Sequence, residues 1–201
     1  MATFNLPELD SVDRYKLLTG LIVPRPIAWI GTVGRDGVHN LAPYSFFNCV
    51  SATPPTVVVG TGHRSGAPKD TLSNLRDTGV FTVSIVTEDV AKAMNITSEN
   101  VAPHVDEFVK AGVTAVMGTT VSAPYVGEAK ATLECEVNHI LPLGEPATSW
   151  LVIADVRTLH VADDLLDGTR VDAKRLEAVG RFAGGQYCTT ADGLFTLERP
   201  D

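Results

Sequence analysis

The fold of this 201-residue chain is decided by residues 24–48, PRPIAWIGTVGRDGVHNLAPYSFFN. Pro24 and Pro26 exclude a helix at the start of this stretch, because proline lacks a backbone N–H and restricts the residue before it. The apolar, β-rich run over residues 27–33 predicts a strand. An Asp-Gly turn signal follows, so residues 38 to about 42 are expected to fold back and complete a hairpin.

More short strands are expected outward from this hairpin, at residues 46–51, 56–60, 81–86, 131–140 and 150–161. The β-branched run at 56–60 suits a strand covered on both faces. The alternation of apolar and hydroxyl residues at 81–86 is typical of a half-buried strand. Many short strands with turns between them predict a mainly antiparallel barrel with appended helices.

Short helices are expected at residues 69–77, 88–95 and 105–111. Asp70 or Thr71 could cap the first of them, and Gly79 stands where a helix commonly ends in the left-handed conformation. The chain before residue 24 is interpreted as a short polar lead-in. A last hairpin is expected around residues 191–193, Ala-Asp-Gly.

Composition limits the partners of the chain. Asp and Glu number 24 against 16 Lys and Arg, which gives a formal net charge of −8. Nucleic acid is therefore not expected as a partner. The N-terminal residues show no basic start before an apolar run, and no apolar run reaches the length of a bilayer span. We expect a cytoplasmic protein that does not enter the membrane, with one domain over residues 1–201.

Aromatic and short polar side chains gather at residues 40–48, NLAPYSFFN. Pro43 interrupts the strand ladder, and such a break exposes backbone amides. A flat ring such as an isoalloxazine needs apolar and aromatic walls, together with donors and acceptors at one edge. A core strand that leaves a tight corner would explain the same aromatic residues.

Residues 69–71, Lys-Asp-Thr, are a second candidate. They follow a polar, glycine-rich stretch at 61–68 and begin a predicted helix, whose N-terminus offers N–H groups and a favourable dipole to a phosphate. Lys69 would add charge, and Thr71 a hydroxyl donor. Ordinary capping, with Lys69 in solvent, explains the same residues. The complete phosphate-loop motif GxxxxGK[ST] does not occur.

A third candidate is the segment 180–187, GRFAGGQY. Its glycines let the backbone approach a ligand or a neighbouring subunit, and Arg181 can bind phosphate or carboxylate. Glycine pairs also mark ordinary turns, so both interpretations stay open.

The remaining reactive residues give weaker signals. The five histidines form neither HxH nor HExxH, and no serine lies in a GxSxG motif, so a metal site or a hydrolase has little support. Cys49, Cys135 and Cys188 form no CxxC pair and are expected to be buried free thiols. The pair Asp106-Glu107 is interpreted as the solvated face of a helix.

Six segments together resemble a known family. They are residues 24–29, 40–48, 69–71, 106–108, 133–135 and 180–187. In this order they resemble the flavin reductase-like proteins, and the resemblance spans roughly residues 15–190. It implies a mainly β fold, an FMN-binding split β-barrel with antiparallel Greek-key strands and a few peripheral short helices.

The resemblance also implies a homodimer with one FMN per subunit, bound near the subunit interface. The flavin ring would lie against residues 42–48, and residues 69–71 would hold the phosphate. The cofactor-binding residues implied in this way are Thr32, Ala42, Pro43, Tyr44, Ser45, Phe47, Asn48, Lys69, Asp70, Thr71, Arg181 and Tyr187.

The activity implied is hydride transfer from NADH or NADPH to FMN, with the reduced flavin serving a monooxygenase or another acceptor. Because the flavin carries the chemistry, no acid–base pair needs to stand out in the sequence. Three alternatives remain. They are a non-enzymatic, flavoredoxin-like FMN protein for electron transfer, a barrel without flavin that serves as an interaction module, and an FMN-dependent oxidase of the pyridoxamine phosphate type. The acidic composition disfavours the last of these.

Overall fold

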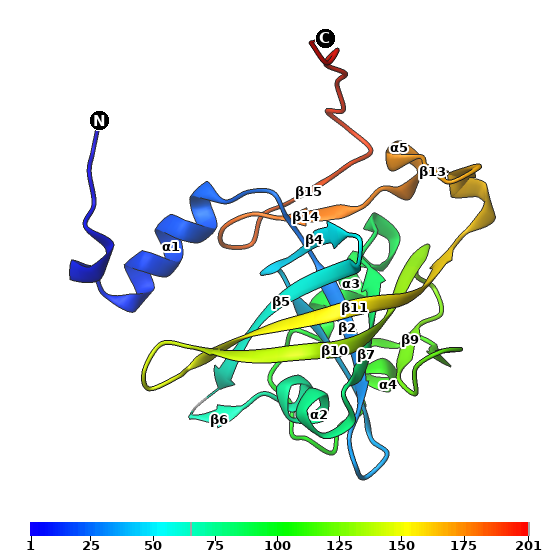
Figure 1. Ribbon diagram of the computed structural model, residues 1–201, viewed down its shortest axis with the longest axis horizontal. Coiled ribbons are helices and arrows are strands. Elements are labelled where there is room, and N and C mark those ends of the chain that lie inside the picture. The colour runs from blue at the N-terminus through cyan, green and yellow to red at the C-terminus, as the bar shows by residue number, and fades with distance from the viewer. Residues whose placement is uncertain (65, 201) are drawn as a thin grey trace.

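The computed structural model describes residues 1–64 and 66–200. An antiparallel sheet of eight strands curls into a barrel (Figure 1). Seven strands follow the order β3-β2-β7-β10-β11-β5-β4, and β6 pairs with β5. Their bounds are β2 Ala28–Val33, β3 His39–Tyr44, β4 Phe47–Ala52, β5 Pro55–Arg64, β6 Ala67–Pro68, β7 Val80–Ile85, β10 Ala131–Leu143 and β11 Ser149–Val161. The mainly β, antiparallel barrel is confirmed. Ser65 of the polar stretch and Asp201 of the tail lie outside the described residues.

Small sheets and short helices surround the barrel. The strands are β1 (Arg25–Pro26), β14 (Val179–Arg181) and β15 (Tyr187–Thr189) in one sheet, β8 (Ala115–Met117) and β9 (Pro124–Val126) in a second, and β12 (Leu166–Asp167) and β13 (Arg170–Val171) in a third. The helices are α1 (Ser11–Leu21), α2 (Asp70–Thr78), α3 (Ala91–Ile96), α4 (Glu107–Ala111) and α5 (Ala173–Leu176), with 3₁₀ turns at Leu6–Glu8, Glu88–Val90 and Asp163–Leu165. The helix expected over 88–95 is thus divided into a 3₁₀ turn and α3.

The two edge strands of the barrel sheet, β3 and β4, follow one another in the chain. Ser45 and Phe46 link them, and Gly60 of β5 donates its N–H to the Phe46 carbonyl at 2.7 Å. A Cβ atom on Gly60 would lie 2.9 Å from the Phe46 Cβ, so only glycine lets the link close against β5. The aromatic corner therefore lies at the seam between the two edges.

The hairpin of β2 and β3 forms at the predicted Asp-Gly turn. Gly37 has φ +82°, and the Gly34 N–H donates to the Val38 carbonyl at 2.9 Å. Successive residues of β2 alternate between two apolar clusters, so that Ile30 packs inside the barrel and Trp29 packs against the helices outside. The hairpin thereby ties the barrel to α3 and α4.

β7 is buried on both faces, which corrects the predicted half-buried strand. Phe81 faces the barrel core, and the hydroxyl residues lie on the opposite face, under β9. Thr82 donates its hydroxyl to the Pro124 carbonyl at 2.5 Å, and the Ser84 hydroxyl accepts the Val126 N–H at 3.1 Å. The alternation was identified correctly, but these hydroxyls satisfy a covering strand rather than water.

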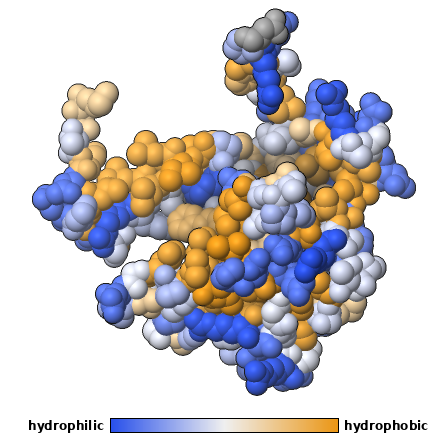
Figure 2. Space-filling model, in the orientation of Figure 1, coloured by the Kyte–Doolittle hydropathy of each residue, from blue (hydrophilic) through white to orange (hydrophobic). Residues whose placement is uncertain are grey.

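Residues 1–23 are more than a polar lead-in, because they contain α1. The Asp10 carboxylate caps this helix by accepting the N–H of Asp13 at 2.8 Å. α1 stands out from the barrel, and apolar side chains gather along it (Figures 1 and 2). The exposed large apolar residues of α1 and its C-cap are Val12, Tyr15, Leu18, Leu21 and Ile22.

α2 covers the predicted helix to within one residue, but its cap differs from the prediction. Lys69 is the N-cap residue in place of Asp70 or Thr71, and its side chain makes no capping hydrogen bond. Gly79 ends the helix in the left-handed conformation, with φ +71°, as expected.

The C-terminal hairpin lies earlier in the chain than predicted. β14 and β15 form it, and the Phe182 N–H donates to the Gln186 carbonyl at 2.9 Å across the turn. Within the described residues no strand follows β15, so the expected hairpin at 191–193 is wrong. The prediction of buried thiols holds for Cys135 only, because Cys49 and Cys188 are exposed.

Glu134 on β10 is a fully buried carboxylate that holds the loop after β8. Its two oxygens accept the N–H groups of Thr119, Thr120 and Val121 at 2.6–2.8 Å. His160 Nε2 lies 2.5 Å from Oε1 on the adjacent strand. Burial alone would raise the pKa of Glu134, but the hydrogen bonds from His160 and the three amides outweigh it and lower the pKa to about 2.

Candidate functional site

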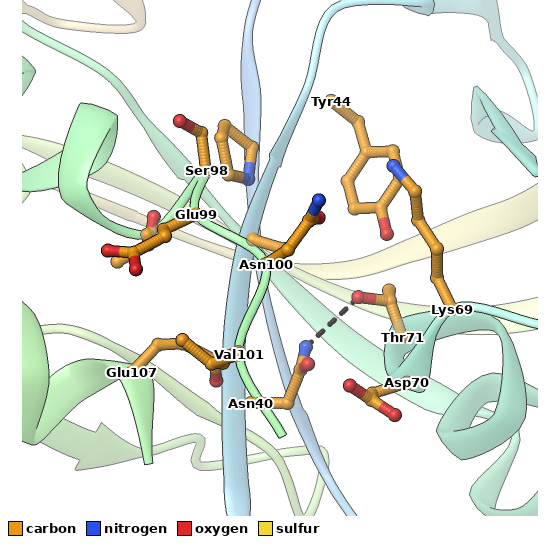
Figure 3. Close-up of a pocket in the computed structure, with 13 residues that line it drawn as sticks. Asn40, Tyr44, Lys69, Asp70, Thr71, Ser98, Glu99, Asn100, Val101 and Glu107 are labelled. Atoms are coloured by element: carbon orange, nitrogen blue, oxygen red, sulfur yellow. Dashed lines mark hydrogen bonds between the residues drawn. The ribbon is translucent and has the colours of Figure 1, made fainter. Parts of the chain in front are cut away.

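A cleft of about 220 Å³ opens along the outer edge of β3. Figure 3 shows the side chains of β3 and of the start of α2 on one side of it, and those of residues 97–101 and α4 on the other. The lining residues are Asn40, Ala42, Pro43, Tyr44, Lys69, Asp70, Thr71, Thr97, Ser98, Glu99, Asn100, Val101 and Glu107. The cleft thus brings together two of the candidate segments, 40–48 and 69–71.

The sequence of β3 determines which backbone groups its outer edge presents to the cleft. Leu41 and Pro43 are two residues apart, so their nitrogens share one direction, away from β2. Pro43 has no N–H, and the Leu41 N–H donates to the Glu107 carboxylate at 3.0 Å. At these two positions the edge offers carbonyl oxygens to the cleft, rather than the exposed amides that the proline suggests.

A buried amide and hydroxyl network holds β2, β3 and α2 together behind the cleft. Asn40 Nδ2 donates to the Thr71 hydroxyl at 3.0 Å and to the Thr32 hydroxyl at 3.3 Å. Asn74 Nδ2 also donates to the Thr32 hydroxyl, at 3.0 Å. Thr32 is fully buried, so it orients Asn40 and Asn74 and lies outside the cleft lining.

The start of α2 has the geometry of an anion-binding site. The first three amides of an α-helix have no partner within the helix, and no side chain of the N-cap residue satisfies them here. The Lys69 ammonium group lies 5.2 Å from the centre of the Tyr44 ring. This corner can therefore bind a negatively charged group beside an aromatic face.

Tyr44 is buried, and its hydroxyl has no hydrogen-bond partner of normal geometry among the described residues, although Thr61 and Thr71 lie nearby. Burial raises the pKa of Tyr44, so the phenol stays protonated at neutral pH. Such an unsatisfied group costs free energy unless a bound molecule or water provides a partner.

A second hollow adjoins the cleft at Pro43 and Ser98 and brings in the third candidate segment. Arg181 and Tyr187 line it together with Ser45. The Arg181 guanidinium hydrogen-bonds the Tyr187 hydroxyl, and its carbon lies 4.4 Å from the centre of the Tyr187 ring. All three candidate segments therefore meet around Pro43–Ser45.

Arg25 joins the segments of this second hollow, although sequence reasoning gave it no role in the site. Its buried guanidinium donates to the carbonyls of Thr19, Ile22 and Phe182 at 2.6–3.1 Å, and Nε reaches the Ser45 hydroxyl at 3.4 Å. One cation thus fixes the end of α1, the aromatic corner and the C-terminal hairpin.

Replacing Arg25 by lysine should loosen this junction, because a single ammonium cannot reach acceptors in four directions. We expect a loss of about 2–4 kcal/mol in the free energy of unfolding. Hydrogen exchange should show faster exchange in α1 and in β14–β15, with the barrel strands unchanged. If the variant and the wild type exchanged at the same rates in α1 and in β14–β15, the assigned role would be contradicted.

Two further expected contacts lie outside the cleft and the second hollow. Phe47 packs against the apolar cluster inside the barrel. Asn48 is exposed on β4, where it pairs with Val58. The expected roles of Thr32, Phe47 and Asn48 toward a ligand stay predictions, as do those of the residues that line the hollows.

The sequence did not predict Glu107 as a residue of the site, because the pair Asp106-Glu107 was interpreted as the solvated face of a helix. That interpretation is wrong: Asp106 caps α4, and Glu107 is buried on the cleft wall. Burial is the main cause that raises the pKa of Glu107; the Leu41 N–H opposes the rise, and Asp70 and Asp106 add to it. The Asp-Glu pair before an apolar run was the available signal, since an acidic residue at a helix start often caps it.

The pH dependence of Glu107 can be tested with glutamine and alanine variants. A folded-state pKa above the unfolded value means that the charged form opposes folding, so this penalty on wild-type stability fades as pH falls through the raised pKa toward 4.5. Glu107→Gln should be at least as stable as wild type at pH 7 and lack this gain on acidification. Glu107→Ala leaves the Leu41 amide unpaired and should cost about 1–3 kcal/mol. Urea unfolding at several pH values measures both effects.

The described residues hold neither a metal-binding cluster nor a membrane-spanning helix. Within 1–64 and 66–200, no three His, Cys, Asp or Glu side chains gather in a metal-binding arrangement. None of the helices in this part of the chain has the length and apolar character needed to cross a bilayer.

The site occurs in a chain that matches a known family model. The model of the flavin reductase like domain matches residues 20–190. This chain belongs to that family. The family binds flavin, and the match covers the cleft, the start of α2 and the C-terminal hairpin, so the resemblance seen in the sequence is confirmed.

Solved structures agree with membership of the flavin reductase-like family. Nitrilotriacetate monooxygenase component B from Bacillus cereus is 37% identical, with a TM-score of 0.94 and 98% of each chain covered. The 2-nitrobenzoate 2-nitroreductase of Pseudomonas fluorescens is 28% identical, with a TM-score of 0.90 over 99% of this chain and 96% of that one. A putative flavin reductase with a split barrel domain from Shewanella frigidimarina, 21% identical with a TM-score of 0.84 over all of both chains, has the same fold. The split barrel is therefore confirmed.

Proposed function

We propose that this chain is a flavin reductase that binds FMN at the corner of β3 and α2 and uses NADH or NADPH as the hydride donor. The observation that carries the proposal is the cleft itself, in which an aromatic corner, an uncapped helix start and Lys69 meet. A phosphate and a flat polar-edged ring together need this combination.

The residues present fit FMN. The amides at the start of α2 and the Lys69 ammonium would hold the phosphate, and Pro43 and Tyr44 would support the ring. The Tyr44 hydroxyl, which has no partner of normal geometry, is a donor that a flavin or its bound water could satisfy. Arg181 and Tyr187 would border the ring from the C-terminal side.

Bound FMN supplies the hydride-accepting chemistry. The chain's own residues hold the two reactants in contact and keep bulk water away. The Asn40–Thr32–Asn74 network keeps β3 and α2 at a fixed separation. Glu107 fixes the edge of β3 through the Leu41 N–H. This division of labour requires no acid–base pair in the protein.

The proposal includes an acceptor and a subunit partner. The similarity to a monooxygenase component at 37% identity supports delivery of reduced flavin to a monooxygenase. The exposed apolar side chains of α1 and of the tail, Phe195 and Leu197 among them, support a homodimer. Light scattering on the purified protein measures the second point, and a monomeric mass at micromolar concentration would contradict it.

The test is an absorbance spectrum followed by anaerobic reduction. The purified protein with FMN should show the visible absorbance band of a protein-bound flavin. NADH or NADPH should bleach this band, and steady oxidation of the nicotinamide should follow when air is admitted. Bound FMN without turnover would favour the non-enzymatic carrier instead. A purified protein that does not bind added FMN would overturn the proposal.

A further inference from the structure

A larger hollow of about 440 Å³ lies on the other side of Lys69 from the cleft. The two share Pro43, Tyr44 and Lys69. The additional walls are Gly60–His63 of β5, Trp150 at the end of the β10–β11 hairpin, and Tyr15 of α1. A ligand longer than a mononucleotide could therefore extend from the cleft past Lys69 into this hollow.

The two sides of Lys69 differ in charge. The cleft carries Asp70, Glu99 and Glu107 on its walls. Among the described residues that line the hollow there is no Asp or Glu, and Lys69 belongs to both linings. A second phosphate group that extends past Lys69 therefore meets no described carboxylate on the wall of the hollow, and the ammonium between the two spaces attracts it.

The far wall of the hollow is a stacking surface. The His63 ring lies 4.3 Å from the Trp150 ring, centre to centre, at an interplanar angle of 39°. The Arg76 guanidinium carbon lies 4.9 Å from the centre of the same indole, which restrains it. Phe46 and Tyr15 form a second aromatic pair at 6.5 Å on the side of the corner. Trp150 is only 8% exposed, and His63 and Arg76 cover its ring, so the ring that can receive a purine base is His63, with Trp150 behind it.

The floor of the hollow contains an unsatisfied donor. Thr61 is only 5% exposed, and its hydroxyl has no hydrogen-bond partner among the described residues. The Tyr44 hydroxyl nearby is in the same state. These two hydroxyls lie beside each other without a hydrogen bond of normal geometry, so a polar ligand in the hollow could complete their hydrogen bonding.

We propose that this hollow binds the adenylate half of a dinucleotide, with the base stacked on the His63 ring that Trp150 supports and its phosphate toward Lys69. The inference rests on the proposed function, because it extends the same site. An adenylate can come from two sources, a flavin adenine dinucleotide or the nicotinamide dinucleotide donor. Their shared chemistry is a purine with an anionic phosphate linkage.

The direct probe is 5′-AMP, titrated calorimetrically into the whole protein without flavin. We expect AMP to bind the wild type and the His139→Ala control, which removes an exposed histidine elsewhere on β10. His63→Ala and Trp150→Leu should each weaken the binding by about tenfold. Trp150 is the more buried of the two residues, so its variant could misfold, and His63→Ala then still tests the proposal. No AMP binding, or equal affinity in all four proteins, would overturn the proposal.

Two ratios then identify the source of the adenylate. They are the affinity for FAD relative to FMN, and the KM for NADH relative to that for reduced nicotinamide mononucleotide. If a flavin dinucleotide uses the hollow, the variants lose affinity for FAD while affinity for FMN is unchanged. If the nicotinamide donor uses it, KM rises for NADH and stays constant for reduced nicotinamide mononucleotide. Constancy of both ratios would also overturn the adenylate assignment. Failure of the proposed function would give a different result, because the wild type would then bind AMP but not FMN.

Discussion

Lys69→Ala should weaken FMN binding by about ten- to a hundredfold, because a charge-assisted contact to phosphate contributes on the order of 1.5–3 kcal/mol. Lys69 is the N-cap residue of α2, and its ammonium group lies at the boundary of the cleft and the hollow. Fluorescence titration of FMN measures the change. Lys69→Arg should recover part of the affinity, since it restores the charge but alters the geometry.

The matched control for this experiment is Lys92→Ala, which removes an exposed lysine from α3. It changes the net charge by the same amount, so a general electrostatic effect would appear in both variants. The loss for Lys69→Ala should exceed the loss for Lys92→Ala at every salt concentration. Equal affinities in the two variants would remove Lys69 from the phosphate site.

Glu134→Ala should lower the free energy of unfolding by about 3–5 kcal/mol, the largest loss of stability that we expect from a single substitution. The substitution leaves three amides and His160 without their shared acceptor. Glu134→Gln should be milder but still destabilising, because one of its polar atoms can only donate. Thermal or urea unfolding measures both variants.

The same carboxylate predicts a loss of stability in acid. Its pKa in the folded protein, about 2, lies below the ordinary value of 4.5, so its contribution is complete above 4.5 and is lost as pH falls toward 2. In Glu134→Gln this part of the acid dependence should be absent. Arg157→Ala serves as a control, since its exposed pair with Glu136 on the same strands is worth little. Parallel stability profiles for wild type and Glu134→Gln between pH 5 and pH 2 would contradict the role assigned to Glu134.

Local patterns in the sequence predicted the features that depend on neighbouring residues. The Asp-Gly turn placed the hairpin of β2 and β3, and the Lys-Asp-Thr segment placed the start of α2. Gly79 predicted the end of that helix correctly. In each case the signal lies within a few residues of the feature, where turn and cap chemistry act.

Contacts between distant segments were not predictable in the same way. The Glu107 carboxylate meets the Leu41 N–H across 66 residues of chain, and the role of Arg25 depends on a carbonyl 157 residues away. The wall at residues 97–101 carries no motif, and its place depends on the bond from Trp29 to Thr97. β7 shows the same limit, because its pattern identified two faces but could not show that β9 covers one of them.

The central claim is that a flavin lies at the corner of β3 and α2, and a crystal structure of the protein soaked with FMN tests it most directly. The account predicts density for the ring against Pro43 and Tyr44, with the phosphate within hydrogen-bond distance of the amides at the start of α2 and of Lys69. A structure in which FMN lies elsewhere, or in which that helix start stays empty at saturating FMN, would contradict it.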